Sequence, residues 1–452
     1  IRFWSLDGQL RGGGDDAHRG GVRGVRQFGD ALVSWGGDGA IRFWSLDGQL
    51  RGGADDAHRG GVEGVRQFGE ALVSWGLDGA IRFWSLDGQL RGGVDDAHRG
   101  GVEGVQQFGD ALVSCGEDGA IRFWSLDGQL RGGADDAHRG RVRDVLQFGD
   151  ALVSWSWVGA IRFWSLDGQL RGGADEAQLD RVRDMRQFGD ALVSWSWDGA
   201  IRFWSLDGQL RGGADDAHRD AVWGVQQFGE ALVSWGEDGA IRFWSLDGQL
   251  RGGADDAHRD AVWGVQQFGE ALVSWGEDGA IRFWSLDGQL RGGADDAHHG
   301  GVLGVQQCGE ALVSWGEDGA IRFWSLDGQL RGGADDAHRG RVEGVGQVGD
   351  ALVSWGEDGA IRFWSLDGQL RGGADNAHRG GVGGVQQFGE ALVSWGEDGA
   401  IRFWSLDGRA LDLLVVPGGI RRLLVLEQRQ CVVAFGRSVW GYDLKGLDAI
   451  KL

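Results

Sequence analysis

The chain consists of one 40-residue unit that recurs from its first residue almost to its last. Residues 201–240 and 241–280 are identical, which indicates recent internal duplication. The octapeptide IRFWSLDG marks each copy and begins at Ile1, Ile41, Ile81, Ile121, Ile161, Ile201, Ile241, Ile281, Ile321, Ile361 and Ile401. A unit of this length cannot bury its apolar side chains alone, whereas stacked copies form a continuous core. We therefore expect an array of one small unit rather than several unrelated domains.

Each unit contains four short segments typical of β-strands. In residues 41–80 these segments are 41–46, 49–51, 62–68 and 71–75. Asp47-Gly48 between the first two favours a tight hairpin turn, and no window has the apolar spacing of a long amphipathic helix. The unit therefore predicts an all-β fold of four-stranded antiparallel sheets. Stacked radially, such sheets form a β-propeller, whose blades have this length.

The charge balance excludes some classes of partner. The chain has 45 basic and 67 acidic residues and a net charge of -22, which repels nucleic acid and anionic membranes. Cys115, Cys308 and Cys431 provide neither a disulfide framework nor metal-ligand spacing. No apolar run approaches the ~20 residues of a membrane span. We expect a cytoplasmic protein that binds neither nucleic acid nor membranes.

Four residue types recur at fixed places in the units, and in the first copy they are His18, Ser34, Asp38 and Trp44. With Ala17 before the His, this pattern resembles the WD-repeat β-propeller family, and the resemblance covers practically the whole chain. The family's Trp-Asp dipeptide is Trp-Ser here, as at Ser45. The Leu-Val-Ser-Trp run at 32–35 is similar to long bacterial arrays of the family. The resemblance implies that the four side chains form a buried hydrogen-bond relay that stabilises each blade.

The copies predict about 11 blades. The chain opens with half a blade, so we expect an N-terminal part to be missing, and it ends in a degenerate blade. Val158 replaces the turn Asp of the fourth complete copy and Gln178 replaces the His of the fifth. Seven 40-residue blades counted back from the C-terminus begin at about residue 177, which lies close to both changes. We predict a partial propeller in residues 1–176 and a seven-bladed propeller in residues 177–452, with one large ring as the alternative. Restoring Asp at Val158 or His at Gln178 should raise thermal stability.

Ser34, His18 and Asp38 are the residue types of a hydrolase triad, but a catalytic set occurs once per site, and this set recurs along the chain. The Asp15-Asp16 pair beside His18 has residue types that bind metals, although adjacent Asp side chains seldom converge on one ion. We expect no enzyme activity, no cofactor and no metal site.

The differences between copies gather at two places. One is the start of the segment that corresponds to 62–68, which is the innermost strand of a blade, and the other is the residue before the turn Asp. In a propeller these places share one rim, which we call the variable rim. The exposed loop 46–49 hardly changes between copies, so uniform drift does not explain the pattern. Trp and Arg are typical of interface hot spots. The partner-binding residues predicted on this rim are Arg143, Trp157, Arg181, Arg183, Trp197, Trp223, Trp263, Leu303 and Glu343.

These observations predict a non-catalytic scaffold or sensor that binds one or more protein partners through the variable rim. The alternative is a multivalent glycan-binding propeller with a similar pocket in each blade. A glycan-binding propeller would need near-identical pockets, whereas the rim varies. We expect replacement of Trp223 and Trp263 to leave folding intact and to weaken partner binding at least tenfold, about 1.4 kcal/mol.

Overall fold

The computed structural model describes residues 1–4, 10–14, 17–175, 177, 181–389, 391–415, 422–426, 431–435 and 439–443. All regular elements in these residues are β-strands, labelled β1 to β45. The first four-stranded sheet contains β3 (Val22–Phe28), β4 (Ala31–Gly36), β5 (Ile41–Ser45) and β6 (Leu50–Ala54). Later sheets repeat these bounds every 40 residues up to β42, except for β25 (Ile241–Trp244), β41 (Ala400–Ser405) and β42 (Ala410–Val415).

The predicted all-β fold of four-stranded antiparallel blades is confirmed. Within the described residues there are ten four-stranded sheets, in each of which the strands lie side by side in chain order. A two-stranded sheet of β1 (Arg2–Trp4) and β2 (Leu10–Gly13) precedes them, and the last sheet contains β43 (Arg422–Leu426), β44 (Cys431–Phe435) and β45 (Val439–Asp443). Residues 444–452 of the predicted degenerate last blade lie outside the described residues.

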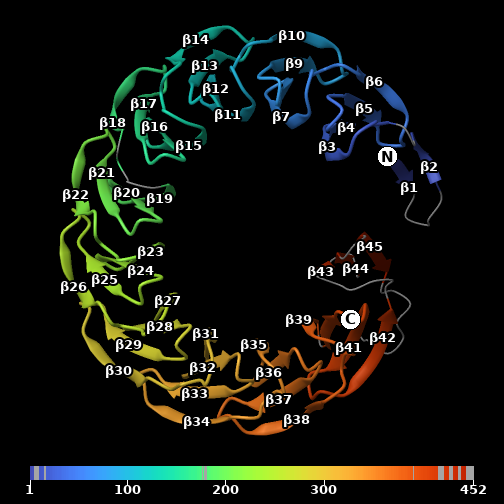
Figure 1. Cartoon of the computed structure of the whole chain (residues 1–452). Coiled ribbons are helices and arrows are strands. Elements are labelled where there is room, and N and C mark those ends of the chain that lie inside the picture. Colours follow the sequence, from blue (N-terminus) through green and yellow to red (C-terminus); the bar gives the residue numbers. More distant parts are fainter. Residues whose placement is uncertain are drawn as a thin grey trace. The chain divides into compact units, whose positions relative to one another are not determined.

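The chain divides into two compact units. Unit 1 contains Ile1–Ala217 and Leu246–Gly248, and unit 2 contains His218–Ser245 and Gln249–Leu452. In unit 1 the first strands β7 (Val62–Phe68), β11 (Val102–Phe108), β15 (Val142–Phe148) and β19 (Val182–Phe188) lie at one edge, and the fourth strands lie at the opposite edge (Figure 1). The division into rings at residues 176/177 and the single-ring alternative stay predictions.

The hydrophobic core lies between neighbouring sheets. In unit 2, Phe268 and Phe283 of one sheet are buried together with Val302 and Trp324 of the next. The rings of Phe283 and Trp324 have centroids 6.3 Å apart and are tilted by 46°. Since IRFW is constant in the complete copies, the described junctions within each unit use the same large side chains, whose burial stabilises the stack.

One glycine in most first strands is required by close packing. Gly264 pairs with Trp275 across β27 (Val262–Phe268) and β28 (Ala271–Gly276), and a Cβ at Gly264 would lie 2.3 Å from Cζ2 of that indole. The Trp275 ring therefore covers the backbone of the neighbouring strand, where any larger side chain would displace it.

Candidate functional site

The four recurring polar residues meet in one chain of hydrogen bonds. Trp44 Nε1 donates to Ser34 Oγ over 2.9 Å, and Ser34 Oγ lies 2.9 Å from His18 Nε2. His18 Nδ1 lies 3.0 Å from Asp38 Oδ1. Since an indole only donates and a carboxylate only accepts, Trp44 donates into the set and Asp38 accepts at its other end, from an N–H at His18 Nδ1. We call this set the relay.

The protonation of the relay follows from its surroundings. Burial lowers the pKa of His98 and keeps its imidazole neutral. Burial by itself raises the pKa of Asp118, but hydrogen bonds from the Arg99 N–H and from His98 outweigh it and hold this pKa at about 2. At neutral pH the relay is therefore a neutral His that donates to an ionised Asp.

The relay is not arranged for nucleophilic catalysis. Ser34 has no exposed surface, and its Oγ is engaged by both Trp44 and His18. A nucleophile must be reached by its substrate and activated by its base in the same pocket. This geometry instead ties the third strand of a sheet to the loop before its first strand.

The sheet of β15 to β18 (Val142–Ala174) departs from this pattern. Val158 occupies the place of Asp, and His138 Nδ1 is buried without a hydrogen-bond partner in the described residues. Burial, with the nearby Arg162 charge, lowers the pKa of His138 to about 3. Ser156 stands where other copies have Gly, and its Oγ accepts from the Ala160 N–H. Asp38 accepts the corresponding N–H in the first sheet.

Ser156 gives a physical reason for the change at Val158. At the equivalent Gly36 of the first sheet, a Cβ would lie 2.6 Å from both His18 Nδ1 and Asp38 Oδ1. A Ser in this position therefore crowds the His–Asp hydrogen bond. In the next sheet Ser196 also replaces Gly, and there the His position is Gln178, which lies outside the described residues.

We expect the double variant Ser156→Gly/Val158→Asp to raise stability by about 1 kcal/mol, because it returns a partner to His138 Nδ1. Val158→Asp alone should gain less, since Ser156 still crowds the bond. Thermal denaturation of both variants and the parent chain measures the difference. A lower melting temperature for the double variant would show that this sheet has adapted to the absence of the relay Asp.

Several residues of the variable rim form one cluster in unit 1. Trp157 and Trp197 are 39% and 44% exposed. The guanidinium carbons of Arg143 and Arg181 lie 5.1 and 5.3 Å from the centre of the Trp157 ring. That of Arg183 lies 4.6 Å from the centre of the Trp197 ring. These distances are within cation–π range, so five of the nine predicted residues lie in contacts of this kind on two neighbouring sheets. We call these five residues the Arg–Trp cluster.

The other predicted rim residues lie in unit 2 and differ from the cluster. Trp223, Trp263 and Leu303 are half-buried rather than exposed. The Trp263 ring lies across the next sheet, where a Cβ at Gly301 would be 2.3 Å from its Cη2 atom. Glu343 Oε1 is 2.9 Å from Arg341 Nε. Trp263 therefore packs against a neighbouring sheet and is also partly exposed at the surface.

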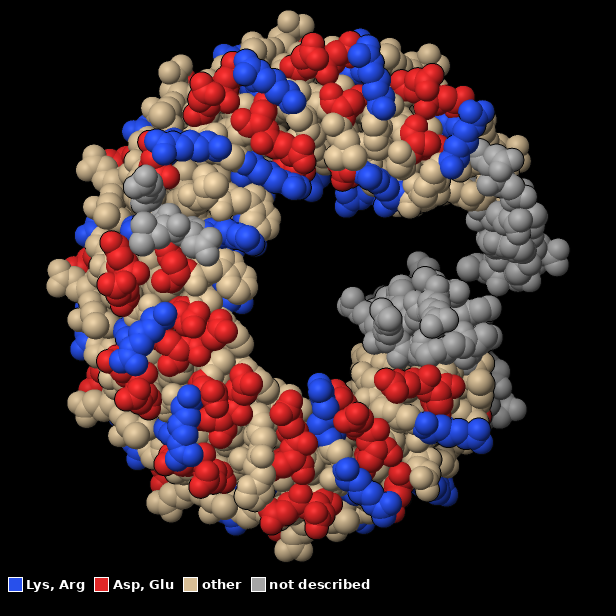
Figure 2. Space-filling model, viewed as in Figure 1, with Lys and Arg blue, Asp and Glu red and all other residues tan. Residues whose placement is uncertain are grey.

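Charge along the rim differs between the units. Figure 2 shows basic side chains along the edge of unit 1 that carries its first strands, whereas the corresponding edge of unit 2 is mainly acidic or uncharged. The residue equivalent to Trp157 is Glu in every complete copy of unit 2, at Glu237, Glu277, Glu317, Glu357 and Glu397. The Arg–Trp cluster is therefore a local basic and aromatic surface on an acidic chain.

Sequence reasoning did not single out two acidic residues beside the cluster. Asp144 and Asp184 replace the Gly that the Trp ring covers in other sheets. Asp144 Oδ1 accepts from Gln106 Nε2 over 3.1 Å and from the Val145 N–H over 2.8 Å. The sequence does contain a signal for them. In the two copies that carry Trp157 and Trp197, an Asp and a Ser both stand where most other copies have Gly.

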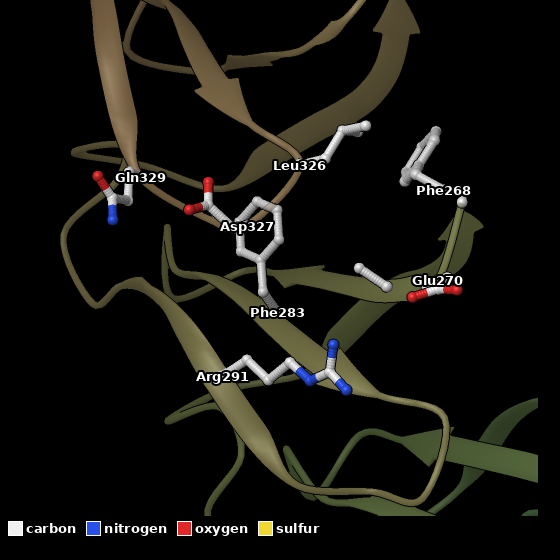
Figure 3. Close-up of a pocket in the computed structure, with 9 residues that line it drawn as sticks. Phe268, Glu270, Phe283, Arg291, Leu326, Asp327 and Gln329 are labelled. Carbon is white, nitrogen blue, oxygen red and sulfur yellow. The ribbon is translucent and has the colours of Figure 1, made fainter.

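A pocket of about 560 Å³ lies between neighbouring sheets of unit 2 (Figure 3). Phe268 and Phe283 provide apolar surface, and Leu326 and Asp327 belong to the turn between β33 (Ile321–Ser325) and β34 (Leu330–Ala334). Its polar lining residues are Glu270, Arg291, Asp327 and Gln329. These residue types recur in most copies, unlike those of the rim.

The described part of the chain contains neither a metal-binding cluster nor a membrane-spanning helix. No three His, Cys, Asp or Glu side chains there are placed to hold a metal ion, and Asp15 and Asp16 lie outside it. No helix there is long and apolar enough to span a membrane. Cys115 and Cys308 are buried, and burial raises their pKa values to about 12 and about 11, so both thiols stay protonated.

Comparisons with known proteins concern single repeats and the fold. The family model "WD40: WD domain, G-beta repeat" matches residues 93–125, which contain the complete relay of His98, Ser114, Asp118 and Trp124. No curated protein matches the chain. The computationally designed Ika8 protein is 25% identical, with a TM-score of 0.37 over 68% of this chain and 97% of that chain. The WD40 β-propeller domain of Doa1 is 20% identical, with a TM-score of 0.33 over 56% of this chain and 88% of that chain.

Proposed function

Since the chain is a WD40-repeat propeller protein, with the matched repeat copied along its length, we propose that it is a non-catalytic scaffold or sensor. In this proposal its variable rim binds a protein partner in the cytoplasm, without nucleic acid, membrane or cofactor. Proteins of this family commonly mediate protein interactions and are typically non-catalytic.

The Arg–Trp cluster is the observation that carries the proposal. Two large indoles remain exposed at 39% and 44% in a fold that buries the Trp of the ten IRFW segments from residue 41 to residue 404. Exposed Trp next to Arg has the composition of an interface hot spot, where truncation commonly costs ~2 kcal/mol or more. The core does not require these side chains, because equivalent positions in other copies hold Glu or Gly.

We expect Trp157→Glu/Trp197→Glu to weaken partner binding at least tenfold while leaving the fold intact. Glu occupies this position in other copies, so it is compatible with the turn. The partner is first captured from lysate on the immobilised chain and identified, and its affinity is then measured by calorimetry. Leu77→Glu is the matched control, because Leu77 holds the same position in another sheet of unit 1 and is 47% exposed.

A second pair tests the rim of unit 2. Trp223→Glu/Trp263→Glu is expected to weaken binding at least tenfold if the partner also spans that unit, and circular dichroism checks that Trp263 is not needed for folding. If neither pair changes the affinity for the captured partner, the binding surface lies elsewhere and the proposal is wrong.

The recurring pocket favours a second candidate, a multivalent glycan-binding propeller. Phe268, Arg291 and Asp327 have counterparts in most copies, which matches the requirement for near-identical pockets that add through avidity. A glycan array and calorimetry separate the candidates. The lectin is favoured if the chain has several equal weak glycan sites and Arg291→Ala removes only the site at its own pocket. The scaffold is favoured if no glycan binds.

A further inference from the structure

We propose that the Arg–Trp cluster of unit 1 binds an acidic segment of a partner protein, whose carboxylates pair with the guanidinium groups of Arg143 and Arg181. This inference rests on the proposed function and names the chemistry of its partner. It concerns the surface of the sheets β15 to β18 and β19 to β22 (Val182–Ala214) alone.

The two guanidinium groups are held in place before a ligand arrives. Both lie over the same indole, Trp157, and Arg143 Nη1 also donates to the Val182 carbonyl over 3.3 Å. Stacking on a ring fixes the plane of a guanidinium group, while its N–H groups point outward in that plane. Carboxylates are recognised by these in-plane donors, often in pairs, so a prepositioned Arg loses little freedom on binding.

Three carboxylates near the cluster, among the residues that the structure describes, have partners of their own. Asp144 is engaged by Gln106 and Val145, and Asp184 accepts from the Met185 N–H over 2.8 Å. Glu103 Oε2 is 2.7 Å from Arg141 Nη2. Within the described residues, these three acids are thus bound to groups outside the five residues of the cluster.

Charge selects a short acidic segment over a long polyanion. The chain as a whole carries a net charge of -22, which disfavours a nucleic-acid strand that would extend beyond the cluster. Acidic residues at alternate positions of an extended peptide lie about 7 Å apart. A peptide with two or three such residues can therefore contact neighbouring arginines without leaving the surface of two sheets.

The test uses the full chain and a fluorescent, end-blocked hexapeptide that alternates glutamate with alanine, followed by anisotropy. The cluster variant is Arg143→Leu/Arg181→Gly, since Leu303 and Gly21 occupy these positions in other copies. The matched control is Arg23→Leu/Arg26→Gln, which also removes two positive charges from unit 1 and introduces residue types that other copies have there. Circular dichroism confirms that each variant is folded.

We expect the cluster variant to bind the peptide at least tenfold more weakly than the parent chain, and the control variant to change affinity by twofold or less. Binding should weaken as salt rises, and the matching glutamine–alanine peptide should not bind. Equal losses in both variants, or equal binding of the glutamine peptide, would overturn the proposal.

Other possible ligands of the Arg–Trp cluster would give different results in these experiments. Tighter binding of a single-stranded oligonucleotide that depends on Arg143 and Arg181 would overturn the proposal in favour of nucleic acid. Concentration-dependent sedimentation of the parent chain, lost in the cluster variant, would overturn it in favour of a second copy. If the glutamate peptide does not bind but the captured partner still depends on Trp157, the acidic chemistry is wrong while the proposed function stands.

Discussion

Ser354→Ala is expected to lower the free energy of unfolding by about 3 kcal/mol, because the change removes the centre of a relay. Trp364 Nε1 donates to Ser354 Oγ over 2.9 Å, and His338 Nε2 lies 2.8 Å from the same oxygen. Without the hydroxyl, both nitrogens are left buried without a partner, and each such group costs about 1–3 kcal/mol. Urea denaturation followed by tryptophan fluorescence measures the loss.

Ser365→Ala provides the control for this prediction. Ser365 lies on the neighbouring strand of the same sheet, and its Oγ accepts from the Gln369 N–H at a turn close to solvent. Its removal should cost clearly less than removal of Ser354. Similar losses in the two variants, or a change below about 1 kcal/mol for Ser354→Ala, would contradict the role assigned to the relay.

The second large effect is an acid-dependent loss of stability. Burial lowers the pKa of several relay histidines, and that of His138 falls to about 3. The unfolded chain then binds more protons than the folded chain, so stability is complete above the unfolded His pKa of about 6.5 and falls as pH is lowered toward the folded value. The histidines with a lowered pKa are His58, His98, His138, His338 and His378.

The relay aspartates extend this loss to lower pH. The pKa of Asp278 is about 2, since hydrogen bonds from His258 and the Arg259 N–H outweigh the opposing effect of burial. Its stabilisation is present above the unfolded Asp value and is lost as pH falls through the folded one. We expect more than about 3 kcal/mol to be lost between pH 7 and pH 4, and more below that.

Urea denaturation at a series of pH values checks this dependence, with His378→Gln as the matched variant. Gln already occupies this relay position at Gln178, and it does not titrate. The variant should be less stable at pH 7 and show a shallower dependence on pH. A stability that stays flat from pH 7 to pH 4 in the parent chain would show that the relay histidines are not kept neutral by the fold.

The strands were predictable because each copy carries its own turn signals. Asp47-Gly48 and Gly69 mark the ends of strands, and the 40-residue period repeats the information along the chain. The exposure of the rim tryptophans was not predictable in the same way. Trp263 and Trp197 are both rim tryptophans, yet Trp263 is half-buried because it lies over Gly301 of the next sheet.

The change at Ser156 is a second feature whose effect could not be predicted from the sequence. The sequence shows that Val158 has replaced Asp, but only the geometry shows that a Cβ at the Ser156 position would press on the His–Asp bond. The number of blades in a ring is a third limit, because identical units do not determine the angle at which a ring closes. That number depends on small rotations between sheets, to which residue patterns are insensitive.

The junctions between sheets have an evolutionary consequence. Residues such as Phe283 and Trp324 recur at these junctions, so a sheet copied from elsewhere in the chain presents the surfaces that its new neighbours require. Unequal recombination between copies therefore inserts or removes whole sheets without creating an unmatched core. Because each sheet carries its own rim residues, such a recombination also changes the order of Arg, Glu and Trp along the surface. Rearrangement of existing copies can therefore change the residues on the surface while the core stays matched.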